Sequence, residues 1–380
     1  MFDLSRRTEN LLKYAPTFFG EALYLMNNPT QATNDIRALS FSHSRQLVDW
    51  MSQETMSFAF TSYQTGRLFL AGVDENRKLS MVQRQFTRAM GLHVSDQQLY
   101  LADLYQLWRF DNLLKPGERY EKSFDRLFVP RLGRTTGDLD VHDIGIDEGR
   151  APIFVNSLYS CLATVSDTAN FKPLWKPPFI SKLAAEDRCH LNGLAMDGNK
   201  PAYVTAVSKS DSVEGWRHRK RDGGILMDVE SGEIVVDGLS MPHSPRLHEG
   251  ELWLLNSGTG WFGKADLKTG AFEPVTFCPG FLRGLSLHGK YAIVGTSLPR
   301  NVGFGGLDLD DNLKERDTDP RCSILIINIE TGDIVHWLNF ESHITELYDA
   351  AFLPNVKRPM HFGFQTNEIR QLITIENGLS

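Results

Sequence analysis

The chain has 380 residues, of which 41% are hydrophobic, so it is long enough to bury a sizeable core. Its formal net charge of −7 gives no electrostatic reason to expect nucleic acid or an anionic membrane as a partner. No apolar run approaches the length of a membrane span, and the first residues lack the apolar core of a signal peptide, so we expect a cytoplasmic protein.

The first 50 residues differ from the rest of the chain. Apolar residues recur at loose helical spacing in 10–14, 19–26 and 44–51, which predicts an N-terminal helical extension over residues 1–50. We expect this extension to pack on the main domain or on a second subunit, which would make it a route to an oligomer. Residues 51–380 are expected to form the main domain.

Six related short openings recur along the main domain, and most of them join polar residues to glycine or alanine and then to an apolar run. They lie at 90–92, 142–146, 190–195, 243–247, 282–285 and 348–352. Repeats of roughly 40–50 residues that contain short β-rich runs and turns indicate propeller blades rather than helix pairs. Hairpins with Ser-Gly or Thr-Gly, at 231–232, 269–270 and 331–332, add turn residues that suit left-handed backbone.

The predicted fold is therefore all-β, a six-bladed β-propeller with seven blades as the alternative. We expect strands at 360–364 and 369–375 to pair with the first β segment, 57–87, and so to close the ring. The four cysteines form no CxxC pair, so we expect four free thiols and no structural zinc site.

One position of each opening is expected to face the central channel, because the innermost strands of a propeller meet there. This column holds Met90, Asp143, Asn192, Ser244, Arg283 and Asp349, and neighbouring positions add His142, His190 and His243. Oxygen donors suit Ca²⁺, Mg²⁺ or Mn²⁺, whereas imidazole brings in Zn²⁺. We predict a divalent metal ion held by Asp143, Asn192 and Asp349. A polar, water-filled channel without a catalytic role is the alternative.

The same region offers catalytic and substrate-binding candidates. His142, His190 and His243 are predicted to act as metal ligands or general bases, since imidazole titrates near neutral pH. Arg283 is predicted to balance a carboxylate or to hold a substrate carboxylate through two hydrogen bonds.

Two loops extend this set of candidates. The basic loop 215–221 is either a solvated loop or an anion-binding flap, with Trp216 as a stacking face and Arg217 as a clamp. Asn256 begins a Gly-rich turn, 256–260, that is expected to turn backbone N–H groups toward an anion.

The openings and their flanks resemble a bacterial family of uncharacterised propeller-like proteins over about residues 45–376. The shared stretches include 60–66, 177–181, 186–194, 215–217, 240–246 and 256–260. More remotely, Asn192-Gly193-Leu194 resembles a strand of the gluconolactonase and strictosidine-synthase-like six-bladed propellers. That resemblance implies that Asn192 is a ligand of a divalent cation. Asp143 and Asp349 have flanks that do not match, and the family's first-blade Glu has no counterpart here.

Two functions follow from this interpretation. The first is a metal-dependent enzyme, hydrolase- or lactonase-like, that acts on a small molecule in the channel. The second is a non-catalytic propeller that binds a peptide or saccharide on its face through the insertions 111–140, 171–179 and 215–221.

Overall fold

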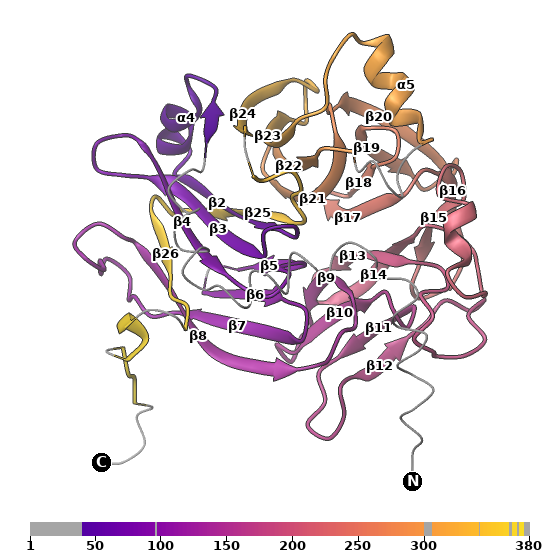
Figure 1. Cartoon of the computed structure of the whole chain (residues 1–380), viewed down its shortest axis with the longest axis horizontal. Helices are drawn as coiled ribbons and strands as arrows, with labels where there is room; N and C mark the ends of the chain where they lie inside the picture. Colours follow the sequence, from indigo (N-terminus) through magenta and orange to yellow (C-terminus); the bar gives the residue numbers. More distant parts are fainter. Residues whose placement is uncertain are drawn as a thin grey trace.

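A computed structural model of the chain describes residues 40–95, 97–299, 306–341, 343–364, 367–370 and 372–375. Six sheets of four or five strands stand around a common centre (Figure 1). The predicted six-bladed propeller is therefore confirmed. Among the described residues, no helix has the length and apolar character needed to cross a membrane.

The first three blades carry the following strands. Blade 1 contains β25 (Ala350–Pro354), β2 (Met56–Ser62), β3 (Arg67–Val73) and β4 (Leu79–Gln85). Blade 2 contains β5 (Leu92–Val94), β6 (Gln98–Ala102), β7 (Gln106–Asn112) and β8 (Arg126–Thr135), with β26 (Pro359–His361) beside β8. Blade 3 contains β9 (Val141–Ile146), β10 (Pro152–Asn156), β11 (Cys161–Thr164) and β12 (Lys172–Trp175).

The other three blades repeat this order. Blade 4 contains β13 (Leu191–Asp197), β14 (Lys200–Ala206), β15 (Gly224–Asp228) and β16 (Ile234–Leu239). Blade 5 contains β17 (Pro242–His248), β18 (Glu251–Asn256), β19 (Trp261–Asp266) and β20 (Ala271–Phe277). Blade 6 contains β21 (Phe281–His288), β22 (Tyr291–Ser297), β23 (Cys322–Asn328) and β24 (Ile334–Phe340), with β1 (Phe41–His43) beside β24.

The core lies between the blades. Six of the hydrophobic clusters lie between blades, one at each junction of neighbouring blades. Strand β2 is apolar on both faces because both faces are covered by neighbouring blades. Phe58 and Phe60 pack into the cluster shared with blade 6, while Ala59 between them packs into the cluster shared with blade 2. A strand that is covered on both faces gains from apolar residues at every position rather than at alternate ones.

The ring closes through a different segment from the one predicted. Strand β25 pairs with β2, so the sixth opening itself supplies the innermost strand of blade 1. Residues 359–361 instead form β26, which runs parallel to β8 at the outer edge of blade 2. Residues 367–370 form the 3₁₀ helix η3 (Asn367–Arg370), not a strand. Alternation of apolar residues predicts strand character but does not say which edge of which sheet a strand joins.

The predicted N-terminal extension is partly built into the ring. Residues 1–39 lie outside the described residues, but β1 pairs with β24, and helix α4 (Leu47–Gln53) follows it. Leu47, Trp50 and Met51 of α4 are buried in the cluster between blades 6 and 1. The segment from residue 40 to 53 therefore belongs to the propeller core.

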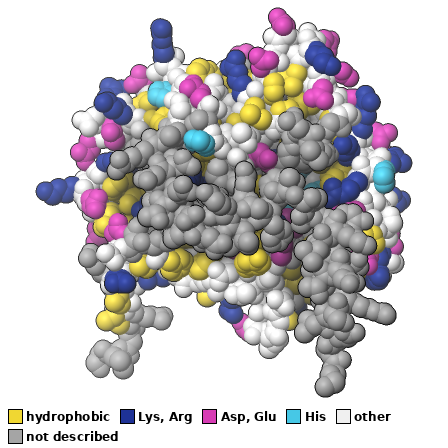
Figure 2. All heavy atoms as spheres, viewed as in Figure 1, with side chains coloured by type: hydrophobic (Ala, Val, Ile, Leu, Met, Phe, Trp, Pro, Cys, Tyr) yellow, Lys and Arg dark blue, Asp and Glu magenta, His cyan; other side chains and the backbone are white. Residues whose placement is uncertain are grey.

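Two helices lie between strands of blades 4 and 6. The 3₁₀ helix η2 (Gly215–His218) precedes β15, and α5 (Asp308–Glu315) precedes β23. Leu309 and Leu313 of α5 pack in one cluster with Trp216 of η2, which anchors the basic loop. Charged side chains of both signs are interspersed on the described part of the face in Figure 2.

All four cysteines are buried and unpaired, as predicted. Burial raises the pKa of Cys161 and of Cys189 to about 12, so both remain thiols at neutral pH.

Candidate functional site

The strand register decides which residues share a level at the centre of the ring. The first residues of β9, β13 and β17 each pair with the last residue of the next strand. The second residues of these strands, His142, Asn192 and His243, are therefore equivalent on blades 3, 4 and 5. Tyr348, whose N–H donates to the carbonyl of Thr61, takes this position on blade 1. We call His142, Asn192, His243 and Tyr348 the histidine level.

The predicted column joined residues of two levels. It aligns Asn192 with Asp143 and Ser244, whereas the pairing places Asn192 one residue earlier, with His142 and His243. Each of these strands has a β-bulge at this point, and a bulge inserts an unpaired residue that hides the register from the sequence.

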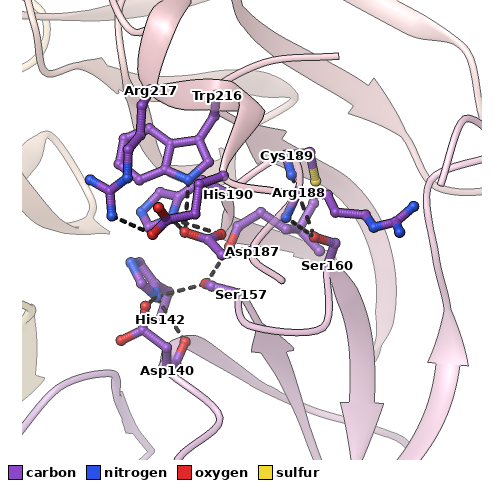
Figure 3. Close-up of polar contacts among 12 residues, drawn as sticks. Asp140, His142, Ser157, Ser160, Asp187, Arg188, Cys189, His190, Trp216 and Arg217 are labelled. Carbon is purple, nitrogen blue, oxygen red and sulfur yellow. Dashed lines mark hydrogen bonds and ion pairs between the residues drawn. The ribbon is translucent and has the colours of Figure 1, made fainter. Parts of the chain in front are cut away.

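A group of possible metal ligands lies at the histidine level. Asp140, His142 and His190 each offer one ligand atom, and these three atoms lie within 4.8 Å of one another. The rings of His142 and His190 meet edge to face with their centroids 4.8 Å apart (Figure 3). Asp140 Oδ2 lies 3.7 Å from His142 Nδ1. Two imidazoles and one carboxylate are a common ligand set for transition-metal ions.

Two histidines of this level are held in the same way. His142 Nδ1 lies 2.9 Å from the carbonyl of Asp140 and 2.7 Å from Ser157 Oγ. His243 Nδ1 lies 2.8 Å from the carbonyl of Met241 and 3.1 Å from Ser257 Oγ. A carbonyl only accepts hydrogen bonds, so Nδ1 carries the proton in both neutral rings and Nε2 presents its lone pair.

A carboxylate and an indole fix His190. Asp187 lies 2.9 and 3.1 Å from His190 Nδ1, and it also accepts a 2.7 Å hydrogen bond from Trp216 Nε1 (Figure 3). The rings of His190 and Trp216 stack at 4.4 Å, and the Arg217 guanidinium lies 4.6 Å from the Trp216 ring. Asp187 and His190 both adopt left-handed backbone, with φ of 41° and 50°. Such conformations in non-glycine residues concentrate at functional sites.

The burial of this level keeps its side chains neutral. Burial lowers the pKa of His142 well below its usual value, and His190 and Arg283 lower it further. Burial, followed by Arg283 and His142, lowers the pKa of His243 in the same direction. Burial raises the pKa of Tyr348 well above 10, so its hydroxyl stays protonated.

A second level lies one residue further along the inner strands. Arg246 donates to both oxygens of Asp143, at 2.7 and 3.1 Å, and to the carbonyls of Leu194 and Leu285 at 2.9 Å. Burial alone would lower the pKa of Arg246, but the Asp143 carboxylate outweighs it and the pKa is raised. Burial and Asp143 raise the pKa of Asp349 to about 7. We call Asp143, Arg246 and Asp349 the carboxylate level.

The carboxylate level joins all six blades. Asp143 is on blade 3, Arg246 on blade 5 and Asp349 immediately before β25 of blade 1. The two carbonyls that Arg246 contacts belong to blades 4 and 6. Asp349 Oδ2 accepts a hydrogen bond from the N–H of Leu92 on blade 2.

This geometry argues against the predicted metal ligands. The Asp143 oxygens accept two hydrogen bonds from Arg246 and two more from the N–H groups of Ile144 and Leu194. Asn192 belongs to the other level, and its Oδ1 accepts a 2.8 Å hydrogen bond from Thr205. A guanidinium therefore occupies the place beside Asp143 at which the sequence predicts a metal ion.

The structure separates the predicted substrate-binding residues. Trp216 and Arg217 lie beside His190, and Arg283 lies 4.8 Å above the Tyr348 ring. Arg283 thus faces the histidine level, and Arg246 takes the charge-balancing role predicted for it. Asn256 has a structural role, because its Oδ1 accepts the N–H of Ser240. The N–H of Gly258 donates to the carbonyl of Ser240, and those of Thr259 and Gly260 donate to carbonyls within the turn, so these groups do not point at an anion as predicted.

Sequence reasoning missed two residues of these levels, Arg246 and Tyr348, and two carboxylates beside the histidines, Asp140 and Asp187. One repeated signal pointed to this end of the channel. Ser157 and Ser257 each follow an Asn at the end of the second strand of a blade, and each contacts the histidine that opens that blade. A His with an Asn-Ser pair after it, in which the Ser lies 14 or 15 residues beyond the His, thus marks blades 3 and 5 in the sequence.

Over residues 45–362 the chain matches the family described as Domain of unknown function (DUF4915). The chain belongs to this family. The match is in line with the resemblance to uncharacterised propeller-like proteins, while the likeness to gluconolactonases stays a prediction. No curated protein matches this DUF4915 member.

Solved structures align with this DUF4915 chain only at low sequence identity. A chain of the nidogen/laminin complex aligns with a TM-score of 0.49 and 12% identity, covering 79% of this chain and 99% of that chain. Virginiamycin B lyase from Staphylococcus aureus aligns with a TM-score of 0.38 and 11% identity, covering 68% and 96%. Similarities this distant carry no argument about activity, which has to be argued from the histidine level.

Proposed function

We propose that the chain is a divalent-metal-dependent enzyme, hydrolase- or lactonase-like, that acts on a small molecule at the histidine level. The convergence of Asp140, His142 and His190, with ligand atoms within 4.8 Å, carries this proposal. Neutral imidazole nitrogens favour Zn²⁺ and other transition metals over Ca²⁺ or Mg²⁺, which prefer all-oxygen sites. A bound ion of this kind would polarise a carbonyl or lower the pKa of water.

The surroundings of these three residues fit a metal centre. Metal-binding histidines usually donate their other ring N–H to a carboxylate or a carbonyl, which fixes the ring. His190 makes this contact with the Asp187 carboxylate, and His142 makes it with a backbone carbonyl. Each ring therefore keeps Nε2 for an ion.

His243 is the best candidate for the general base. Its Nε2 is buried and has no hydrogen-bond partner in the described part of the chain, while its Nδ1 holds the proton. A neutral imidazole with a presented lone pair can accept a proton from a substrate or from water. Its low pKa keeps it in this basic form at neutral pH.

Metal analysis of the full chain tests the proposal. After loading with Zn²⁺ and desalting, wild type should retain one equivalent, and His142→Gln and His190→Gln should lose it. His336→Gln is the matched control, because His336 is also buried but contacts Ser44 on the outer side of blade 6. The metal centre would be overturned if wild type retained no stoichiometric zinc, or if both site variants retained it.

A second measurement separates catalysis from binding. Zinc-loaded protein should hydrolyse members of a panel of small lactones and aryl esters, and His243→Gln should lose turnover while keeping zinc. If the protein binds zinc but hydrolyses no lactone or ester of the panel, the non-catalytic propeller that binds a peptide or saccharide is favoured.

A further inference from the structure

We infer that the ligand of the histidine level carries a small oxyanion, a carboxylate or a phosphate, which Asn192 and Tyr348 bind. The inference rests on the proposed function for its place in the molecule and adds the class of substrate. It starts from two buried donor atoms that have no hydrogen-bond partner among the described residues, Asn192 Nδ2 and Tyr348 Oη. Buried polar groups are nearly always hydrogen-bonded, so a bound group is expected at each of them.

Both atoms are hydrogen-bond donors. Asn192 Oδ1 accepts the hydroxyl of Thr205 at 2.8 Å, which sets the orientation of the amide and leaves its NH₂ group as the available donor. The Tyr348 hydroxyl keeps its proton at all ordinary pH values. The two side chains are 2% and 5% exposed, so bulk water does not satisfy them. The histidine level therefore offers donors on two blades, 4 and 1.

The charge of the surroundings also favours an anion. The guanidinium of Arg283, which is 8% exposed, lies 4.8 Å from the centroid of the Tyr348 ring. The carboxylate of Asp143 is bound to Arg246.

A neutral sugar fits this arrangement less well. Sugar hydroxyls need several acceptors as well as donors, and among the described residues His243 Nε2 is the unpartnered acceptor of this level, since two nearby carboxylates are engaged. Asp187 already accepts from His190 and Trp216, and Asp143 accepts from Arg246. Donors beside a guanidinium instead match a group that only accepts, which is an oxyanion.

Calorimetry with malonate and with inorganic phosphate tests this inference on the metal-free and the zinc-loaded full chain. Malonamide is the neutral control ligand and should not bind. Tyr348→Phe removes one oxygen atom and should weaken oxyanion binding about tenfold or more, the effect of losing a hydrogen bond to a charged group. Asn192→Asp keeps the acceptor for Thr205 but turns the donor into a negative charge, so it should abolish binding. Tyr291→Phe, outside this level, should bind like wild type.

The outcomes distinguish this inference from the proposed function. Binding of malonate alone identifies a carboxylate, and binding of phosphate alone identifies a phosphate. If wild type retains no zinc after loading but still binds an oxyanion, the metal centre is refuted and this inference stands. No binding of either anion by wild type, or equal binding by Tyr348→Phe, would overturn it. Zinc content and the melting temperature of each variant show whether a loss of binding reflects a lost fold.

Discussion

Replacing Arg246 by Met tests the most heavily bonded side chain at the centre of the ring. Arg246 donates two hydrogen bonds to Asp143 and three to the carbonyls of Leu194, Pro245 and Leu285. Met has no donor, so the variant leaves a buried carboxylate without its counter-ion. Breaking a buried ion pair in this way costs about 3–5 kcal/mol. We expect Arg246→Met to lower the free energy of unfolding by that amount.

Unfolding in guanidinium chloride at pH 7, followed by tryptophan fluorescence, measures this loss. The control Arg77→Met removes an exposed ion pair with Asp49, whose side chains are 70% and 53% exposed, and exposed pairs contribute at most about 1 kcal/mol. In the double variant Arg246→Met/Asp143→Asn the side chain at position 143 carries no charge. Its free energy of unfolding should therefore fall less than that of Arg246→Met alone. A loss for Arg246→Met no larger than that for Arg77→Met would refute the reasoning.

Two further predictions concern single carboxylates. Burial and Asp143 raise the pKa of Asp349 to about 7, so the folded state holds this proton more tightly than the unfolded chain, whose pKa is near 3.9. This contribution to stability is therefore complete below about pH 4 and is lost as the pH rises towards 7, and Asp349→Asn should flatten that part of the stability profile. Asp187→Asn should lower zinc affinity about 10–100-fold in competition with a chelator, because Asp187 fixes His190. An unchanged affinity would show that His190 is not a ligand.

The architecture could be predicted because blades are local. Each blade is built from consecutive hairpins, so turn residues such as Gly232, Gly270 and Gly332, all with positive φ, report it directly. The closing strand could not be placed in this way. Its partner β2 lies about 290 residues earlier in the chain, and alternation alone does not choose between 350–354 and 360–364.

The candidate site was predicted in outline but not in register. His142, His190 and His243 could be found because polar residues recur at strand openings that are otherwise apolar. Single-residue bulges decide which residue of one opening lies at the same level as a residue of the next opening. These bulges leave no mark in the sequence. The same limit explains why the sequence pointed to Arg283 rather than to Arg246. Both arginines lie in openings, and only the register shows which one reaches Asp143.

The two levels are connected by adjacent residues of the same strands. His142 is followed by Asp143, and Tyr348 is followed by Asp349. The carboxylate level therefore fixes the backbone that presents two side chains of the histidine level. Asp143 and Asp349 each also accept the N–H of the next residue, which sets the local direction of both strands. A site held within a fraction of an ångström needs such support from rigid neighbours. The internal cation Arg246 thus does by permanent contacts what a structural metal ion would do, and the histidine level is left to bind a ligand.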